Sequence, residues 1–205
     1  MVLIEQLLTK DEVAIFREHL DQVSWLDGKG TAMGMSASVK DNAQADANDD
    51  TVKQLANALL AKYGETPKLV SAVLPQKIFP PCFNRYTSGE TYGLHVDGAI
   101  MRIPNSAEVL RSDMSMTLFL SEPDEYEGGE LVIQTEFGEQ RVKPQAGDAV
   151  TYPSSSLHKV TPVTSGVRIA AITWMQSLVA DTHMREILYE LDQNIQQLMN
   201  NDTVS

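Results

Sequence analysis

Apolar positions recur with a helical period in the first third of the chain and with a shorter period beyond it. A capping box that starts at Thr9, followed by apolar residues at helical spacing, predicts a helix over 10–23. A second helical pattern predicts a helix over 51–63, with Asp50 as its N-cap. The stretch 36–50 between them is small and polar, which is typical of a solvated loop.

Short runs of apolar residues, separated by Gly, Pro and Asp turns, follow in the middle of the chain. They predict nine strands, over 69–74, 77–86, 91–97, 113–120, 130–135, 140–143, 148–152, 157–163 and 167–176. No long amphipathic helix separates these strands, which favours a jelly roll over βαβ units. The predicted fold class is therefore mainly β with flanking helices.

A last helix is predicted after the strands, up to about residue 200. Its apolar stripe consists of Met184, Ile187, Leu188, Leu191, Ile195, Leu198 and Met199. We expect this stripe to pack on the sheet, with self-association into a homo-oligomer as the alternative. The patterns together predict a single domain over 1–205, with a helical N-terminal region (1–66), a jelly-roll core (67–178) and a C-terminal helix (180–200).

Composition narrows the functional classes. The chain has 205 residues, 42% of them apolar, which is enough for one domain with a core of its own. No apolar run approaches the ~18 residues that a bilayer requires, and the N-terminus does not resemble a signal peptide. The single cysteine, Cys82, excludes an internal disulfide, so we expect a cytoplasmic protein without membrane contact. The net charge of −12 without a basic cluster weighs against nucleic acid as a partner.

The candidate chemistry centres on the tripeptide His95-x-Asp97. In a strand these two side chains leave the same face, about 7 Å apart along the backbone, and can converge on one divalent metal. His158 is the candidate third ligand, because His19 and His183 lie in helical patterns near the two ends. Two histidines and one carboxylate form the facial triad of non-haem Fe(II) sites.

Arg168 adds a second requirement to this pattern. It stands ten residues beyond His158, at the start of an apolar strand. A guanidinium is always charged and pairs bidentately with carboxylates. It can therefore hold the distal carboxylate of a dicarboxylic co-substrate whose other end chelates the metal.

Longer motifs surround these residues. They are Phe83-Asn84-Arg85-Tyr86, Gly89-x-x-Tyr92-Gly93-x-His95-x-Asp97, Arg111-Ser112-Asp113-Met114-Ser115, Gly128-Gly129-Glu130-Leu131, Gly147-Asp148-Ala149-Val150-x-Tyr152-Pro153-Ser154 and His158-x-Val160-x-Pro162-Val163-x-x-Gly166-x-Arg168. With them the chain resembles the Fe(II)/2-oxoglutarate dioxygenases of the prolyl-4-hydroxylase type, and most closely the bacterial PKHD-type hydroxylases. The resemblance is strongest over residues 80–178. It implies a double-stranded β-helix (jelly-roll) core, Fe(II) at the triad and 2-oxoglutarate at Arg168.

The resemblance also implies the reaction. O2 and 2-oxoglutarate would be co-substrates, 2-oxoglutarate would be decarboxylated to succinate and CO2, and an unactivated C–H bond would be hydroxylated. The primary substrate would be a peptidyl residue, proline among them, or a small metabolite. Asp97 favours hydroxylation, because related halogenases lack this carboxylate. Ascorbate (vitamin C) is a further candidate cofactor, and no side chain is assigned as a general base.

Other residues receive roles by the same resemblance. Tyr86 matches a position at which relatives place a tyrosine hydroxyl on 2-oxoglutarate, and Tyr92 is expected in the pocket wall. Further candidates for the substrate pocket, with a structural role as the alternative, are Arg111, Asp113, Ser115 and Trp174. The loop 98–112 and the Gly-rich segment 27–34 are expected to shape this pocket.

Two other classes of protein remain open on the residues alone. One is a metal-binding jelly-roll module of the cupin type without oxygenase activity. The other is a zinc hydrolase with an activated water, for which Glu90 or Glu130 would have to serve as general base. Arg168 argues against the first, because a metal store does not need a buried cation ten residues past its last ligand.

Overall fold

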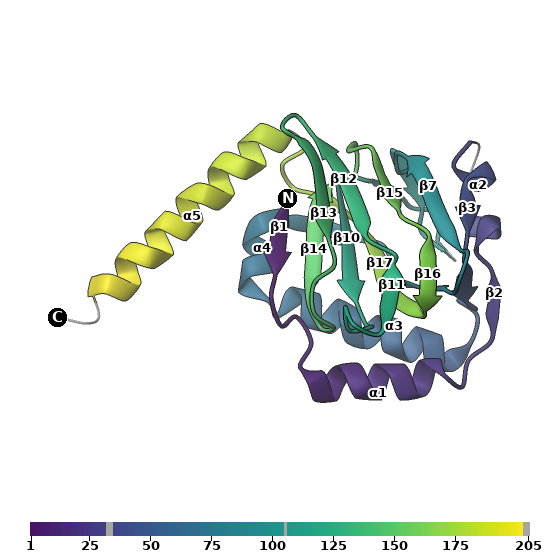
Figure 1. The fold of residues 1–205 in the computed structure, drawn as a ribbon. Coiled ribbons are helices and arrows are strands. Elements are labelled where there is room, and N and C mark those ends of the chain that lie inside the picture. The colour runs from purple at the N-terminus through teal and green to yellow at the C-terminus, as the bar shows by residue number, and fades with distance from the viewer. Residues whose placement is uncertain (32–34, 105, 203–205) are drawn as a thin grey trace.

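Two β-sheets face each other, and helices cover the outer side of the larger sheet (Figure 1). The computed structural model describes residues 1–31, 35–104 and 106–202. Within these residues, no helix is both long enough and apolar enough to cross a membrane.

The larger sheet has eight strands. Their order is β1 (Val2–Ile4), β14 (Ala149–Pro153), β10 (Met114–Phe119), β17 (Arg168–Ser177), β6 (Cys82–Tyr86), β4 (Ala43–Ala45) and β2 (Trp25–Asp27), and β5 (Pro75–Ile78) also pairs with β17. Side chains alternate between the two faces of each strand. On β10, Met116 and Leu118 join the core under the helices, while Ser115 and Phe119 point to the other sheet.

The smaller sheet has five strands. Their order is β13 (Gly138–Val142), β12 (Leu131–Thr135), β15 (His158–Val160), β7 (Thr91–His95) and β3 (Lys40–Asp41). Two small sheets pair β11 (Tyr126–Gly128) with β16 (Val163–Gly166), and β8 (Ile100–Arg102) with β9 (Val109–Arg111). Phe119 and Tyr152 of the larger sheet pack against Leu131 and Ile133 of the smaller one. This face-to-face packing confirms the predicted jelly-roll core.

The helical layer forms on amphipathic segments. The helices are α1 (Lys10–Leu20), the 3₁₀ turn η1 (Gly28–Thr31), α2 (Met35–Ser38), α3 (Asp50–Gly64) and α4 (Pro67–Val73). The capping box at Thr9 is present, which confirms the start of the first predicted helix. The N-cap of α3 is Asp49 and not Asp50, because the Asp49 carboxylate accepts the N–H groups of Thr51 and Val52.

The predicted strand over 69–74 is wrong, because these residues belong mostly to α4. Leu69, Ala72 and Val73 are buried at helical spacing, and Pro67 opens the first turn. A short apolar run fits a buried helix as well as a strand, so the composition of 69–74 did not distinguish between the two. The strand expected over 77–86 is divided into β5 and β6.

The solvated loop predicted over 36–50 is also wrong. The segment contains β3 and β4, one in each sheet, and it carries buried polar side chains at Lys40, Asn42 and Gln44. The N-terminal region over 1–66, predicted to be helical, thus contributes four short strands. Residues 32–34, which belong to the Gly-rich segment expected at the pocket, lie outside the described residues.

The last helix, α5 (Thr182–Asp202), leaves the body of the molecule (Figure 1). It lies against α4 rather than on the sheet, and Ser71 of α4 donates a hydrogen bond to Asp192. All seven residues of its apolar stripe are exposed, with Leu191 54% and Leu198 65% accessible. The expectation that this stripe packs on the sheet is therefore wrong.

Candidate metal centre

The two candidate histidines lie opposite each other on neighbouring strands. His95 of β7 pairs directly with His158 of β15, so both imidazoles leave the same face of the smaller sheet. His95 Nδ1 lies 2.7 Å from the carbonyl oxygen of Gly93, and His158 Nδ1 lies 2.9 Å from that of Ser156. A carbonyl only accepts, so Nδ1 carries the proton in each ring and Nε2 presents its lone pair.

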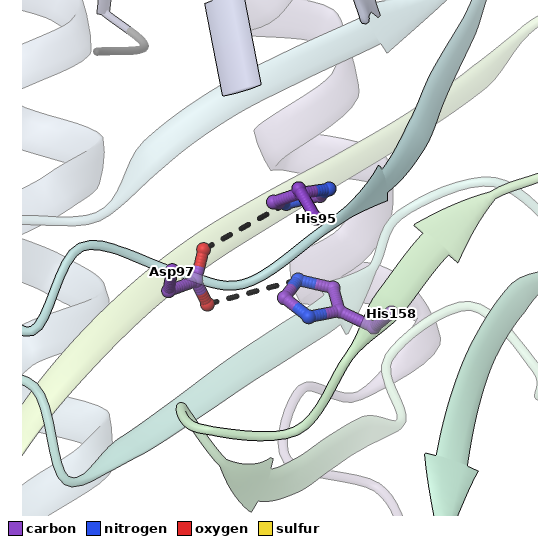
Figure 2. A group of neighbouring side chains, drawn as sticks. All are labelled: His95, Asp97 and His158. Atoms are coloured by element: carbon purple, nitrogen blue, oxygen red, sulfur yellow. Dashed lines mark ion pairs between the residues drawn. The ribbon is translucent and has the colours of Figure 1, made fainter. Parts of the chain in front are cut away.

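Asp97 completes the cluster from a loop. The predicted strand 91–97 ends at His95, and Asp97 lies two residues further on. Its Oδ1 is 3.8 Å from His95 Nε2, and its Oδ2 is 3.7 Å from His158 Nε2 (Figure 2). The three ligand atoms lie within 4.8 Å of one another. Two ligands at about 2 Å from one metal lie at most about 4 Å apart, and the 3.8 and 3.7 Å separations from Asp97 to the two imidazoles meet this limit, so the cluster fits one ion.

The Asp97 carboxylate is held from the opposite sheet. Ser115 Oγ donates to Asp97 Oδ2 at 2.6 Å, and Ser154 Oγ lies 2.8 Å from Ser115 Oγ. Because Ser115 has one proton and gives it to the carboxylate, Ser154 must donate to Ser115. Both serines are buried, so water does not compete for these bonds. The chain Ser154–Ser115–Asp97 thus fixes the carboxylate of a loop residue.

The surroundings of His95 favour its neutral imidazole. Burial lowers the pKa of His95 below its ordinary value, and the facing His158 lowers it further, although the Gly93 carbonyl and Asp97 act in the opposite direction. The Tyr92 ring stacks on the His95 imidazole with centroids 3.6 Å apart and planes at 14°. Tyr92 therefore lies directly against one of the candidate ligands. Neutral nitrogen lone pairs are what a divalent metal requires.

Arg168 is fully buried at the start of β17. Its guanidinium carbon lies 5.2 Å from the centroid of the Tyr86 ring and 5.1 Å from that of Phe119. Nε, Nη1 and Nη2 have no hydrogen-bond partner among the described residues. A buried guanidinium without an acceptor is costly, and a carboxylate in this place would satisfy it bidentately. The donor set fits the distal carboxylate of 2-oxoglutarate.

Two buried hydroxyl groups, one of them beside Arg168, were not predicted from the sequence. Tyr126 OH and Thr117 Oγ1 are buried without a hydrogen-bond partner in the described part of the chain. Burial raises the pKa of Tyr126, while the nearby Arg168 cation opposes this shift. Burial likewise raises the pKa of Tyr86 to about 12, so its phenol stays protonated and can donate. Thr117 lies on the same face of β10 as Ser115, so strand alternation could have indicated it. Tyr126 belongs to β11 in a separate small sheet, to which the alternation along β10 does not extend.

The remaining candidates are placed as follows. Arg111 donates to both oxygens of Asp113, with Nε–Oδ1 at 2.7 Å and Nη2–Oδ2 at 2.8 Å, and Asp113 also accepts the N–H of Ser177. This pairing matches the structural alternative for both residues. The Trp174 ring contacts Phe79 edge-on at 5.5 Å, and its Nε1 is buried without a partner in the described structure.

The general bases considered for a zinc hydrolase are engaged elsewhere. Glu90 accepts the N–H of Thr87. Glu130 forms an ion pair with Arg141 at 3.0 Å on the surface of the smaller sheet. Neither carboxylate belongs to the cluster of His95, Asp97 and His158.

A jelly roll that brings two histidines and a carboxylate together, and also buries an arginine that has no hydrogen-bond partner among the described residues, is typical of the Fe(II)/2-oxoglutarate oxygenases. Residues 81–176 match the 2OG-Fe(II) oxygenase superfamily. A PKHD-type hydroxylase of Alteromonas mediterranea is 66% identical over 200 residues, which cover 98% of this chain and 88% of the relative. A PKHD-type hydroxylase of Shewanella frigidimarina is 67% identical over 199 residues, covering 97% and 88%. The chain belongs to the PKHD-type hydroxylases.

Solved structures agree with this fold. A Pseudomonas putida prolyl-4-hydroxylase superposes with a TM-score of 0.56 at 20% identity, covering 87% of this chain and 92% of that protein. The protein is thus a 2-oxoglutarate-dependent dioxygenase that uses Fe(II), with O2 and 2-oxoglutarate as co-substrates. Membership of this family decides against the cupin-like store and the zinc hydrolase.

Proposed function

We propose that His95, Asp97 and His158 hold the iron, and that Arg168 and the Tyr86 hydroxyl bind 2-oxoglutarate. The observation that carries this proposal is that one jelly roll contains both a set of converging metal-ligand atoms and a buried cation without a counter-charge in the described part of the chain. Three ligand atoms lie within 4.8 Å of one another, and a fully buried guanidinium has no acceptor among the described residues. A metal meets the first requirement and a dicarboxylate meets the second.

Each residue of the proposed site has a defined task. When bound, iron with 2-oxoglutarate and O2 would supply the oxidising chemistry that hydroxylates the C–H bond and yields succinate and CO2. The Nδ1–H bonds to Gly93 and Ser156 orient the imidazoles, and Ser115 orients Asp97. Burial of Arg168 excludes water from the carboxylate that it binds, which strengthens the pairing. No side chain acts as a general base.

For the primary substrate we propose a peptidyl residue, with proline as the first candidate and a small metabolite as the alternative. Support comes from the hydroxylases among the relatives and from the fold shared with a prolyl-4-hydroxylase. Tyr92 and Trp174 are proposed as pocket walls. The hairpin β8–β9 begins three residues after Asp97 and exposes Ile100 (62%) and Val109 (50%), as an apolar rim for a peptide would.

Two further proposals concern the setting of the enzyme. Cytoplasmic localisation is supported by the single cysteine, Cys82, whose pKa burial raises to about 11, so that the thiol is unreactive. Self-association is supported by α5, where Met184, Leu188, Leu191, Ile195 and Leu198 repeat at alternating spacings of four and three. This repeat is the seam of a helix that pairs with another helix.

Anaerobic titration of the protein with Fe(II) and then 2-oxoglutarate tests the site. A weak visible charge-transfer band is expected when both are bound, and His95→Ala should abolish it by removing a metal ligand. Metal binding without a band would contradict the assigned co-substrate site. Aerobic turnover of 2-oxoglutarate, with and without ascorbate, then shows whether ascorbate contributes.

A further inference from the structure

Tyr126 of β11 is a buried tyrosine whose hydroxyl bonds to nothing in the described structure. The residue is 2% exposed, and its hydroxyl has no hydrogen-bond partner among the described residues. Buried tyrosines usually direct the hydroxyl at a partner, because an unpaired polar group loses its bonds to water on folding. The unpaired hydroxyl of Tyr126 therefore points to a partner that the described chain does not itself supply.

Strand pairing brings Tyr126 to the start of β17. Tyr126 pairs with Gly166 across β11 and β16, and Arg168 follows two residues after Gly166. The two backbones approach so closely that a Cβ on Gly166 would collide with the Glu125 carbonyl oxygen and stand 2.8 Å from Tyr126 Cα. Gly166 also has a φ of +75°, which favours glycine. Glycine at position 166 thus allows Tyr126 to lie beside Arg168.

The ring of Tyr126 is held from several sides. A Cβ on Gly129 would stand 2.9 Å from Cε2 of the ring, so glycine at this position leaves room for the phenol. Lys143 Nζ lies 4.0 Å from the ring centroid and also donates to the carbonyl oxygen of Tyr126. The ring packs in one apolar cluster with Tyr86 and Val163. These contacts fix the direction of the hydroxyl before any ligand binds.

The Tyr126 hydroxyl lies close to the guanidinium of Arg168. Burial raises the pKa of Tyr126, whereas the charge of Arg168 and the approach of its guanidinium to the phenol oxygen act in the opposite direction. Neither group has a hydrogen-bond partner within the described structure. A guanidinium only donates, so Arg168 cannot accept the phenol proton even if the two groups move closer together. Both groups are therefore donors that lack the same thing, an acceptor.

We propose that Tyr126 is a further ligand of 2-oxoglutarate and donates its hydroxyl proton to the distal carboxylate that pairs with Arg168. This inference rests on the proposed function, which places 2-oxoglutarate at Arg168. A carboxylate has two oxygens that each accept more than one hydrogen bond, so it can accept two from the guanidinium and a third from the phenol. The hydroxyl thus helps to select a 2-oxo acid whose far end is charged.

The test compares two ligands that differ only at this far end. 2-Oxopentanoate has a methyl group where 2-oxoglutarate has its distal carboxylate, and the metal-chelating ends are the same. Each ligand is titrated anaerobically by calorimetry into the Fe(II)-loaded full chain, so that no turnover is needed. Tyr126→Phe removes only the hydroxyl. Tyr63→Phe is the matched control, because Tyr63 is also buried but lies in the core under the helices, with its hydroxyl 3.4 Å from Thr173 Oγ1.

Tyr126→Phe should weaken 2-oxoglutarate binding by roughly 10- to 100-fold, because one hydrogen bond to a charged group is lost. The dissociation constants of Fe(II) and of 2-oxopentanoate should each stay within about twofold, because neither ligand touches the hydroxyl. Tyr63→Phe should leave the affinities for all three ligands unchanged. The melting temperature of metal-free Tyr126→Phe should not fall, because the hydroxyl that is removed has no partner in the described structure.

Three results would overturn this assignment of Tyr126. The first is an unchanged dissociation constant of 2-oxoglutarate in Tyr126→Phe. The second is an equal loss of affinity for 2-oxoglutarate and 2-oxopentanoate, since a group that acts on the distal carboxylate cannot affect a ligand without one. The third is a lower melting temperature of the metal-free variant, which would make the hydroxyl structural. Failure of the proposed function looks different, because the wild-type protein would then bind 2-oxoglutarate no more tightly than 2-oxopentanoate and would form no charge-transfer band.

Discussion

Replacing Arg168 with methionine should raise the stability of the metal-free protein and weaken 2-oxoglutarate binding at the same time. Arg168 is fully buried, and its three guanidinium nitrogens make no hydrogen bond with the described residues. Methionine keeps most of the apolar chain between Tyr86 and Phe119 and removes an uncompensated charge. Such replacements stabilise by about 1–4 kcal/mol. For a chain of 205 residues, each kcal/mol raises the melting temperature by roughly 2–4 °C.

The effect on the co-substrate has the opposite sign. Removing one partner of a buried charge pair costs about 3–5 kcal/mol, since the other charge is left without a counter-ion. The dissociation constant of 2-oxoglutarate should therefore rise by about 10²- to 10³-fold or more. Fe(II) affinity should change by less than about threefold, because the ligands His95, Asp97 and His158 are untouched.

The assay combines thermal unfolding of the metal-free protein with anaerobic calorimetry for Fe(II) and for 2-oxoglutarate. Arg141→Met is the matched control, because Arg141 is exposed and its ion pairs with Glu130 and Glu139 lie on the surface. It should change stability by no more than about 0.5 kcal/mol. A lower melting temperature with intact 2-oxoglutarate binding would make Arg168 a structural residue. Equal loss of iron and 2-oxoglutarate would also refute the reasoning.

Two further predictions follow from described contacts. Ser115→Ala should weaken Fe(II) binding by about 10- to 100-fold, because Asp97 loses the bond that orients it, while Ser115→Thr keeps the hydroxyl and should retain affinity. Calorimetric Fe(II) titration of both variants checks this, and equal affinities in wild type and Ser115→Ala would contradict it. Leu191→Glu, in the exposed stripe of α5, should convert a dimer into a monomer in light scattering while 2-oxoglutarate binding is unchanged. A monomeric wild-type protein would remove the stripe from self-association.

The fold class and the metal cluster were accessible from the sequence for physical reasons. Strand alternation places His95 on the inner face, and the structure brings His158 directly opposite it. Asp97 joins them from a loop. Strand alternation predicted that Asp97 lies close to His95, but not which residue holds its carboxylate in place. That support comes from Ser115, 18 residues further along the chain and in the other sheet. Such a contact depends on how two sheets are placed, which spacing along the chain does not encode.

The errors have a common cause in local composition. The apolar residues of α4 suit a strand as well as a buried helix. The polar residues from Lys40 to Gln44 indicated a solvated loop, because hydropathy reports how well a side chain tolerates water and not where the fold places it. The sequence did predict the apolar stripe of α5. The side of α5 that faces the rest of the molecule, however, depends on its packing against α4.

The proposed iron site also joins the two halves of the jelly roll. His95 and His158 belong to the smaller sheet, and Asp97 is tied to Ser115 of the larger one. Metal at a hundred times its dissociation constant stabilises the folded state by about 2.7 kcal/mol. Molecules without metal would open more often and be digested sooner by proteases. Iron supply would then set the cellular half-life of this enzyme together with its activity, so scarcity would deplete the protein and not merely leave it idle.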